Sequence, residues 1–141
     1  MMSENTLIYI LQANRLMRSD DEIAAFENAL AELANNPKSE YLPELHLVLD
    51  DRCQHEEVMF SLIHFLESFD VKEQLQAFLH VLPKLLDSAP EWTRIIHTRI
   101  LNDELTSALY QEMLNSVDSH TKNLVTQLLN EILKERHPVK T

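Results

Sequence analysis

The stretch QHEEVMFSLIHFLESF, residues 54–69, predicts a central helix around which we expect the rest of the chain to pack. On a helical wheel its apolar side chains form one broad arc, opposite a strip of polar ones. Phe60 and Ile63 lie outside that arc, beside the polar strip. This helix is therefore expected either to touch a second layer at Phe60 or to present an aromatic ring to a partner. The arc itself contains Val58, Met59, Leu62, Phe65, Leu66 and Phe69.

Apolar periodicity on both sides of this stretch predicts about eight helices and no strand. The first is expected over Thr6–Leu16, the second follows Ser19, which starts a capping box, and a short third one covers Tyr41–Leu49. The connections are short, which favours antiparallel helical hairpins. The last three helices are predicted from apolar stripes, namely Trp92, Ile95, Ile96 and Ile100, then Leu105, Leu109, Met113 and Val117, then Leu124, Val125, Leu128, Leu129, Ile132 and Leu133.

The boundaries of the fifth and sixth helices carry their own signals. Pro83 falls inside the fifth apolar pattern. Because its ring removes one N–H and crowds the preceding turn, we expect a kink or break at Val81 or Leu82. Ser88 and Glu91 have the spacing of a second capping box, in which each side chain bonds a free backbone N–H. We therefore expect this pair to open the sixth helix.

A weak internal repeat favours a stack of hairpins. The sequence LPEL at 42–45 recurs as LPKL at 82–85, 40 residues later. A period near 40 with two helices per unit is typical of HEAT repeats. We therefore predict an all-α fold of stacked antiparallel hairpins, HEAT-like, with a compact irregular bundle as the alternative. One domain is expected over residues 1–141, with residues 136–141 as a frayed tail.

The composition excludes several classes of function. The chain has no glycine, which phosphate-binding loops, dinucleotide fingerprints and nucleophile elbows all require. Its single cysteine, Cys53, allows no disulfide within the chain and no multi-cysteine metal site, and we expect it to be buried or half-buried. The sequence contains no apolar run long enough to cross a membrane and no secretory pattern. We therefore predict a soluble, cytoplasmic protein.

The charge of the chain is strongly negative and unevenly distributed. The formal net charge is -11; residues 1–70 carry 4 basic and 14 acidic side chains, and residues 71–141 carry 8 and 9. No basic stripe is present, which argues against direct nucleic-acid binding. The acidic half is either an ordinary solvated surface or a surface that attracts a basic protein partner.

The polar constellations of the chain do not predict an enzyme, a metal site or a cofactor site. His55 and Glu56 begin like a zinc-protease motif, but the second histidine would fall at position 59, which is Met59. Glu57 lies along one strip with a serine and a histidine, but this spacing supplies neither a base within reach of a nucleophile nor an oxyanion site. Arg99 falls inside an apolar stripe, so we expect it to stack on an aromatic ring or pair with a carboxylate.

The acidic residues near the central helix are the best candidate for partner binding. Glu56 and Glu57 in its first turn also complement the positive end of the helix dipole. Phe60 lies between Glu56 and Glu67, an arrangement that suits an aromatic anchor with a charged rim. The predicted partner-binding residues are Asp50, Asp51, Glu56, Glu57, Phe60, Glu67 and Asp70.

The runs HEEVMFSLIHFLESFD, residues 55–70, and LPKLLDSAPEWTRIIHTRILND, residues 82–103, resemble the immunity protein 30 family. The resemblance extends more weakly over most of the chain. It implies a bacterial, cytosolic antidote, encoded beside a polymorphic toxin, that binds one cognate toxin domain and blocks it. Many such toxins are nucleases with basic clefts, which an acidic surface would cover. The alternative is a helical-repeat adaptor unrelated to toxins; the identity of the toxin, the mode of blocking and the oligomeric state stay open.

Overall fold

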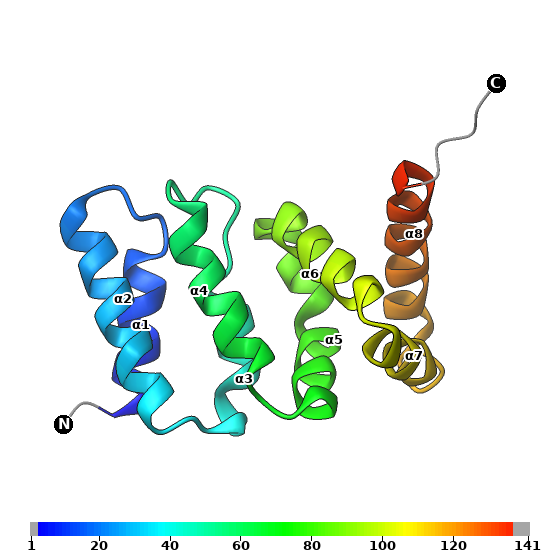
Figure 1. Cartoon of the computed structure of the whole chain (residues 1–141), viewed down its shortest axis with the longest axis horizontal. Helices are drawn as coiled ribbons and strands as arrows, with labels where there is room; N and C mark the ends of the chain where they lie inside the picture. The colour runs from blue at the N-terminus through cyan, green and yellow to red at the C-terminus, as the bar shows by residue number, and fades with distance from the viewer. Residues whose placement is uncertain (1–2, 137–141) are drawn as a thin grey trace.

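The computed structural model of this chain describes residues 3–136, and in that part the chain forms helices and no strand (Figure 1). This confirms the predicted all-α fold. Arg136 ends the last helix, and residues 137–141 of the predicted tail lie outside the described residues. None of the helices described is long and apolar enough to span a bilayer. The elements are α1 Glu4–Asn14, α2 Asp20–Asn35, the 3-10 helix η1 Ser39–Tyr41, α3 Leu42–His46, α4 Glu56–Glu67, α5 Val71–Ser88, α6 Pro90–Asn102, α7 Glu104–Met113 and α8 Ser119–Arg136.

Successive pairs of helices follow one another along the long axis of the molecule (Figure 1). The pairs α1–α2, α3–α4 and α5–α6 form three hairpins, and α7 and α8 close the row. Helix α2 packs beside α4, and α3 packs beside α5. Helices α2, α4 and α6 all begin at the upper edge of the molecule in this view. Their first turns therefore lie along one edge of the stack.

The central helix α4 is shorter at both ends than predicted, and it is covered on more sides. Met59 and Leu62 of the predicted arc are fully buried. Ile63, predicted to lie outside the arc, is also buried, at 1% exposure. Phe60 is half-buried, and its ring meets the ring of Trp92 of α6 edge-on with the centroids 5.1 Å apart. Of the two alternatives for Phe60, the structure shows contact with a second layer.

Of the kink or break predicted at Val81 or Leu82, the break is absent, because α5 runs from Val71 to Ser88 without interruption. A proline inside a helix costs about 3 kcal/mol. Leu75, Phe78, Leu82 and Leu85 of α5 are all fully buried. Burying a large apolar side chain stabilises a fold by about 1.5–3 kcal/mol. Packing on both sides of the proline therefore outweighs the local cost and keeps the helix continuous.

One other local prediction is wrong and a second holds only in part, both for tertiary reasons. Ser88 is the last residue of α5 and does not cap α6, whose N-cap is Ala89, a residue with no side-chain oxygen. Of the stripe predicted for α7, Leu105 is 84% exposed, whereas the later members are half-buried against the core and the fully buried side chain of the helix is Tyr110. By contrast, Ser19 accepts the N–H of Glu22 as its spacing predicted.

Two buried histidines form polar contacts inside the core, and both lie next to the ring of Phe78. His46 donates from Nδ1 to the carbonyl of Leu42 (2.7 Å), and its Nε2 accepts from the amide of Gln74 (2.9 Å). His97 repeats this pattern with the carbonyl of Thr93 (2.8 Å) and the hydroxyl of Tyr110 (2.7 Å). Both rings pack on Phe78, with centroids 5.7 and 5.1 Å away. Burial lowers the pKa of each histidine to about 4, so both are neutral at pH 7.

These histidines predict a loss of stability in mild acid. The unfolded chain binds their protons below pH 6.5 but the folded chain only near pH 4, so the free energy of unfolding falls as the pH drops from 6.5 towards 4. Between pH 7 and pH 5 we expect a loss of about 2 kcal/mol per histidine, measured by urea unfolding. The exposed histidine variant His64→Gln should show the same loss as the unchanged chain. Equal stability at pH 7 and pH 5 would contradict this account.

Candidate functional surface

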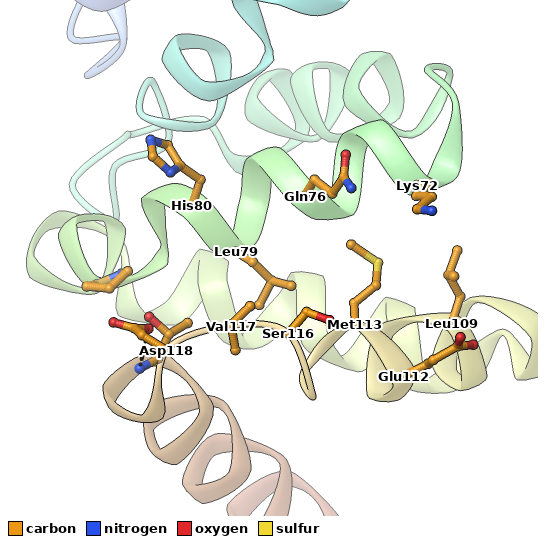
Figure 2. Close-up of a pocket in the computed structure, with 12 residues that line it drawn as sticks. Lys72, Gln76, Leu79, His80, Leu109, Glu112, Met113, Ser116, Val117 and Asp118 are labelled. Atoms are coloured by element: carbon orange, nitrogen blue, oxygen red, sulfur yellow. Dashed lines mark hydrogen bonds between the residues drawn. The ribbon is translucent and has the colours of Figure 1, made fainter.

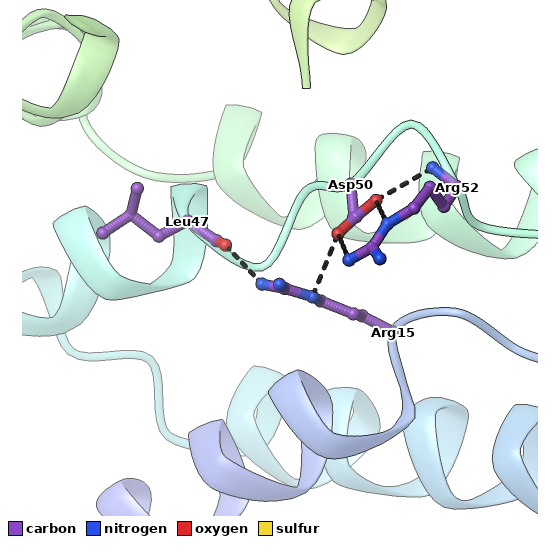
Figure 3. Close-up of polar contacts among 4 residues, drawn as sticks. All are labelled: Arg15, Leu47, Asp50 and Arg52. Carbon is purple, nitrogen blue, oxygen red and sulfur yellow. Dashed lines mark hydrogen bonds and ion pairs between the residues drawn. The ribbon is translucent and has the colours of Figure 1, made fainter. Parts of the chain in front are cut away.

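The loop between α3 and α4 holds Asp50, whose side chain is fully buried between two arginines (Figure 3). Arg52 donates from Nε (3.1 Å) and Nη2 (3.0 Å) to the two carboxylate oxygens, and its backbone N–H adds a third bond of 2.9 Å. Arg15, just after α1, lies 3.3 Å from the same carboxylate and donates to the carbonyl of Leu47 at 3.1 Å. Burial alone would raise the pKa of Asp50, but the bonds from Arg52 and the charge of Arg15 hold that pKa below its ordinary value.

Asp51, the next residue, ties the same loop to the third hairpin. Its carboxylate accepts the backbone N–H of Glu91 (2.8 Å) and of Trp92 (3.2 Å), and so caps the first turn of α6 from a distance of 40 residues along the chain. Its own N–H donates to the carbonyl of Ser88 at 3.1 Å. Capping of this kind stabilises a helix by about 1 kcal/mol. Asp50 and Asp51 therefore hold the three hairpins together, and we call this pair with its contacts the corner.

The other predicted carboxylates fall into two groups along α4. Glu56 and Glu57 are exposed at the first turn of this helix. Glu67 lies at its last turn, about 16 Å away along the helix axis, and forms a two-bond ion pair with Arg99 of α6, at 2.6 and 2.8 Å. This pair confirms the prediction that Arg99 pairs with a carboxylate. Asp70 accepts the N–H of Glu73 and so caps α5. The structure therefore does not gather the seven predicted residues into one cluster, and their role in partner binding stays a prediction.

The positive charges of the acidic half of the chain are all paired with carboxylates. Each of its four basic side chains forms an ion pair with a carboxylate: Arg15 and Arg52 with Asp50, Arg18 with Glu22 and Lys38 with Glu4. Asp20, Asp21 and Glu56 are exposed and have no ion pair within residues 3–136. The excess negative charge therefore faces solvent without a neutralising partner.

Exposed carboxylates gather where α2, α4 and α6 begin, at the upper edge in Figure 1. We call the exposed carboxylates of these three first turns the acidic edge. Only two of them were singled out from the sequence, because nothing in the local pattern of α2 or α6 shows that these helices begin beside α4. The acidic edge consists of Asp20, Asp21, Glu56, Glu57 and Glu91.

Three residues that could carry chemistry, Cys53, His46 and His97, are buried inside the fold. Cys53 is buried, as predicted, and burial is the main cause of the raised pKa of its thiol. Among the described residues, no three His, Cys, Asp or Glu side chains lie close enough to hold a metal ion. His46 and His97 have both ring nitrogens bonded within the core. These three side chains are therefore held by contacts inside the fold.

A groove of about 670 Å³ lies between α5, α7 and the start of α8 (Figure 2). Leu109, Met113 and Val117, from the stripe predicted for the seventh helix, line it. Lys72 lies at one end of the groove and Asp118 towards the other. These three side chains are half-buried, so they pack against the core on one side and border the groove on the other. It contains none of the predicted partner-binding residues and none of the acidic edge.

Comparison with known families agrees with the resemblance seen in the sequence. A family model described as Immunity protein 30 matches residues 13–110 of the chain. The matched residues include the corner, the whole of α4 and the acidic edge. A search of curated proteins and a search of solved structures found no match.

The corner predicts which carboxylates the fold needs. Asp50→Ala removes three hydrogen bonds to Arg52 and the ion pair with Arg15, and we expect the free energy of unfolding to fall by about 2 kcal/mol. Glu57→Ala, an exposed carboxylate a few residues away, should change it by less than about 0.5 kcal/mol. Urea unfolding at pH 7 measures both values. Similar small effects for the two variants would show that the corner does not stabilise the stack.

Proposed function

The chain belongs to the immunity protein 30 family, and we propose on that basis that it binds and neutralises a cognate toxin domain, a nuclease, through its acidic edge. The toxin would be the one encoded by the neighbouring gene, and neutralisation would take place in the cytoplasm. The observation that carries the proposal is the concentration of exposed carboxylates at one end of three adjacent helices.

The acidic edge suits a basic partner in charge and in rigidity. A nuclease cleft that binds phosphates is lined by positive side chains, and carboxylates that face it accelerate encounter and fix the orientation of the complex. The edge is carried by the first turns of helices, and the corner holds two of these helices in place, so little conformational entropy is lost when the partner binds. Inhibition then needs no catalytic residue, since covering the cleft is enough.

The predicted site residues take different roles in this proposal. Glu56 and Glu57 contact the toxin directly. Asp50 and Asp51 act through the fold, because their carboxylates are occupied by the corner contacts. The remaining predicted residues lie further along α4 or just beyond it, namely Phe60, Glu67 and Asp70. An ordinary interface of about 800 Å² on each partner is roughly 30 Å across. The same partner can therefore reach them.

The test is to remove charge from the acidic edge without disturbing the corner. We expect the triple variant Asp20→Asn, Asp21→Asn, Glu56→Gln to associate with the neighbouring toxin domain about tenfold more slowly at low salt, and to show a weaker dependence on salt. Stopped-flow association rates at several salt concentrations measure both effects. Protection of cells that express the toxin should weaken in parallel.

The matched control changes the same number of charges elsewhere. This control is the triple variant Glu104→Gln, Glu112→Gln, Glu131→Gln. The three glutamates that it replaces lie on α7 and α8, are exposed and form no ion pair within the described residues. Association of this control should stay within about twofold of the unchanged chain. Equal slowing of both triple variants would point to net charge and not to the edge. If the unchanged chain does not bind the toxin domain at all, the chain is not its antidote, as expected for an unrelated adaptor.

A further inference from the structure

A pocket of about 230 Å³ opens where the end of α4 meets α5, α6 and α7. The apolar part of its lining includes Ile63 and Leu66 from α4 and Ile96 and Ile100 from α6. All four are buried, with 1–6% exposure, so they form part of the rigid core. Val71, at the first residue of α5, is 43% exposed and belongs to the same lining. The pocket is therefore preformed, and one of the apolar residues of its lining, Val71, is exposed.

The polar groups of this pocket are already paired within the chain. The charges of Glu67 and Arg99 neutralise each other in their two-bond ion pair. Gln74 donates to His46, and Asp103 accepts the N–H of Thr106. A charged or strongly polar ligand would have to displace one of these contacts. The surface of the pocket that has no partner within the chain is apolar. Its burial favours an apolar occupant.

The volume of the pocket indicates that its occupant is a side chain and not a small molecule. Pockets that bind drug-sized ligands usually measure about 300–1,000 Å³. At about 230 Å³ this pocket lies below that range and is suited to a single large side chain. Buried anchors of this kind, inserted into well-packed pockets, supply most of the binding energy of many protein interfaces.

We propose that this pocket receives one large apolar side chain, aromatic or aliphatic, of the same basic partner that the acidic edge attracts. The inference rests on the proposed function and adds how the partner is held after it has been attracted. The rim favours basic neighbours on the partner, because Asp70 and Asp103 lie at the adjoining helix ends and both are exposed. Every residue that lines the pocket lies within the part of the chain matched by the family model.

In this proposal the inserted side chain comes from the partner, whereas the sequence predicted that this chain would supply it. Phe60 was expected to enter a partner, but its ring packs against Trp92. The chain instead offers a hole, about one turn of α4 beyond Phe60 and close to Glu67. The distance from this hole to the acidic edge is about the length of α4, roughly 16 Å, so one partner of ordinary size can contact both.

The test uses the toxin domain encoded by the neighbouring gene and separates dissociation from association. We expect Val71→Trp, which blocks the mouth of the pocket, to make the complex dissociate at least tenfold faster while the salt dependence of association stays unchanged. Thr106→Trp, from the other side of the lining, should act in the same way. Val71→Ala, which leaves the pocket open, should dissociate within about threefold of the unchanged chain.

Leu105→Trp is the matched control, because it adds the same ring to an exposed position outside the pocket and should leave both rates unchanged. Circular dichroism and urea unfolding verify that each variant is folded. If the two blocking variants fold and dissociate like the control while the acidic-edge variant associates slowly, the pocket is not the anchor and the proposed function stands. If the unchanged chain does not bind the toxin domain, the proposed function fails and this inference fails with it.

Discussion

The structure depends on two adjacent carboxylates at one corner of the stack. A row of helical hairpins has few long-range contacts between distant parts of the chain, so neighbouring pairs must be fixed to one another locally. Asp50 does this for the first hairpin through Arg15, and Asp51 does it for the third by capping α6. The loop that carries both residues belongs to the second hairpin. One short segment without regular structure therefore sets the relative position of three pairs of helices.

Carboxylates that look alike in the sequence take different roles in the structure. Those of the corner are occupied by arginines and by backbone N–H groups, so their charge is balanced inside the fold. Those of the acidic edge have no such partners and remain available to a second protein. The ion pair of Glu67 with Arg99 forms a third class, because it balances charge at the surface beside an apolar pocket. Attraction and anchoring would then come from different ends of the same helix.

Much of the local structure could be predicted from the sequence, but its tertiary contacts could not. The helices and their apolar faces follow from periodicity, and the pairing of Arg99 follows from the cost of burying an unpaired charge. Three observations depend on which helices are neighbours in space. Ile63 is buried, Leu105 is exposed, and α5 continues without a break through Pro83. The capping of α6 by Asp51 joins residues 40 apart, and no local rule reveals such a contact. For the same reason the sequence does not reveal three of the five residues of the acidic edge.

Hydrogen–deuterium exchange of the chain alone and in complex with the neighbouring toxin domain would test the central claim most directly. The account predicts slower exchange in the complex at the first turns of α2, α4 and α6 and around residues 63–71. Exchange in α8 and along the groove of α5 and α7 should not change. Protection confined to α7, α8 and the groove, with the first turns of α2 and α4 unaffected, would contradict it.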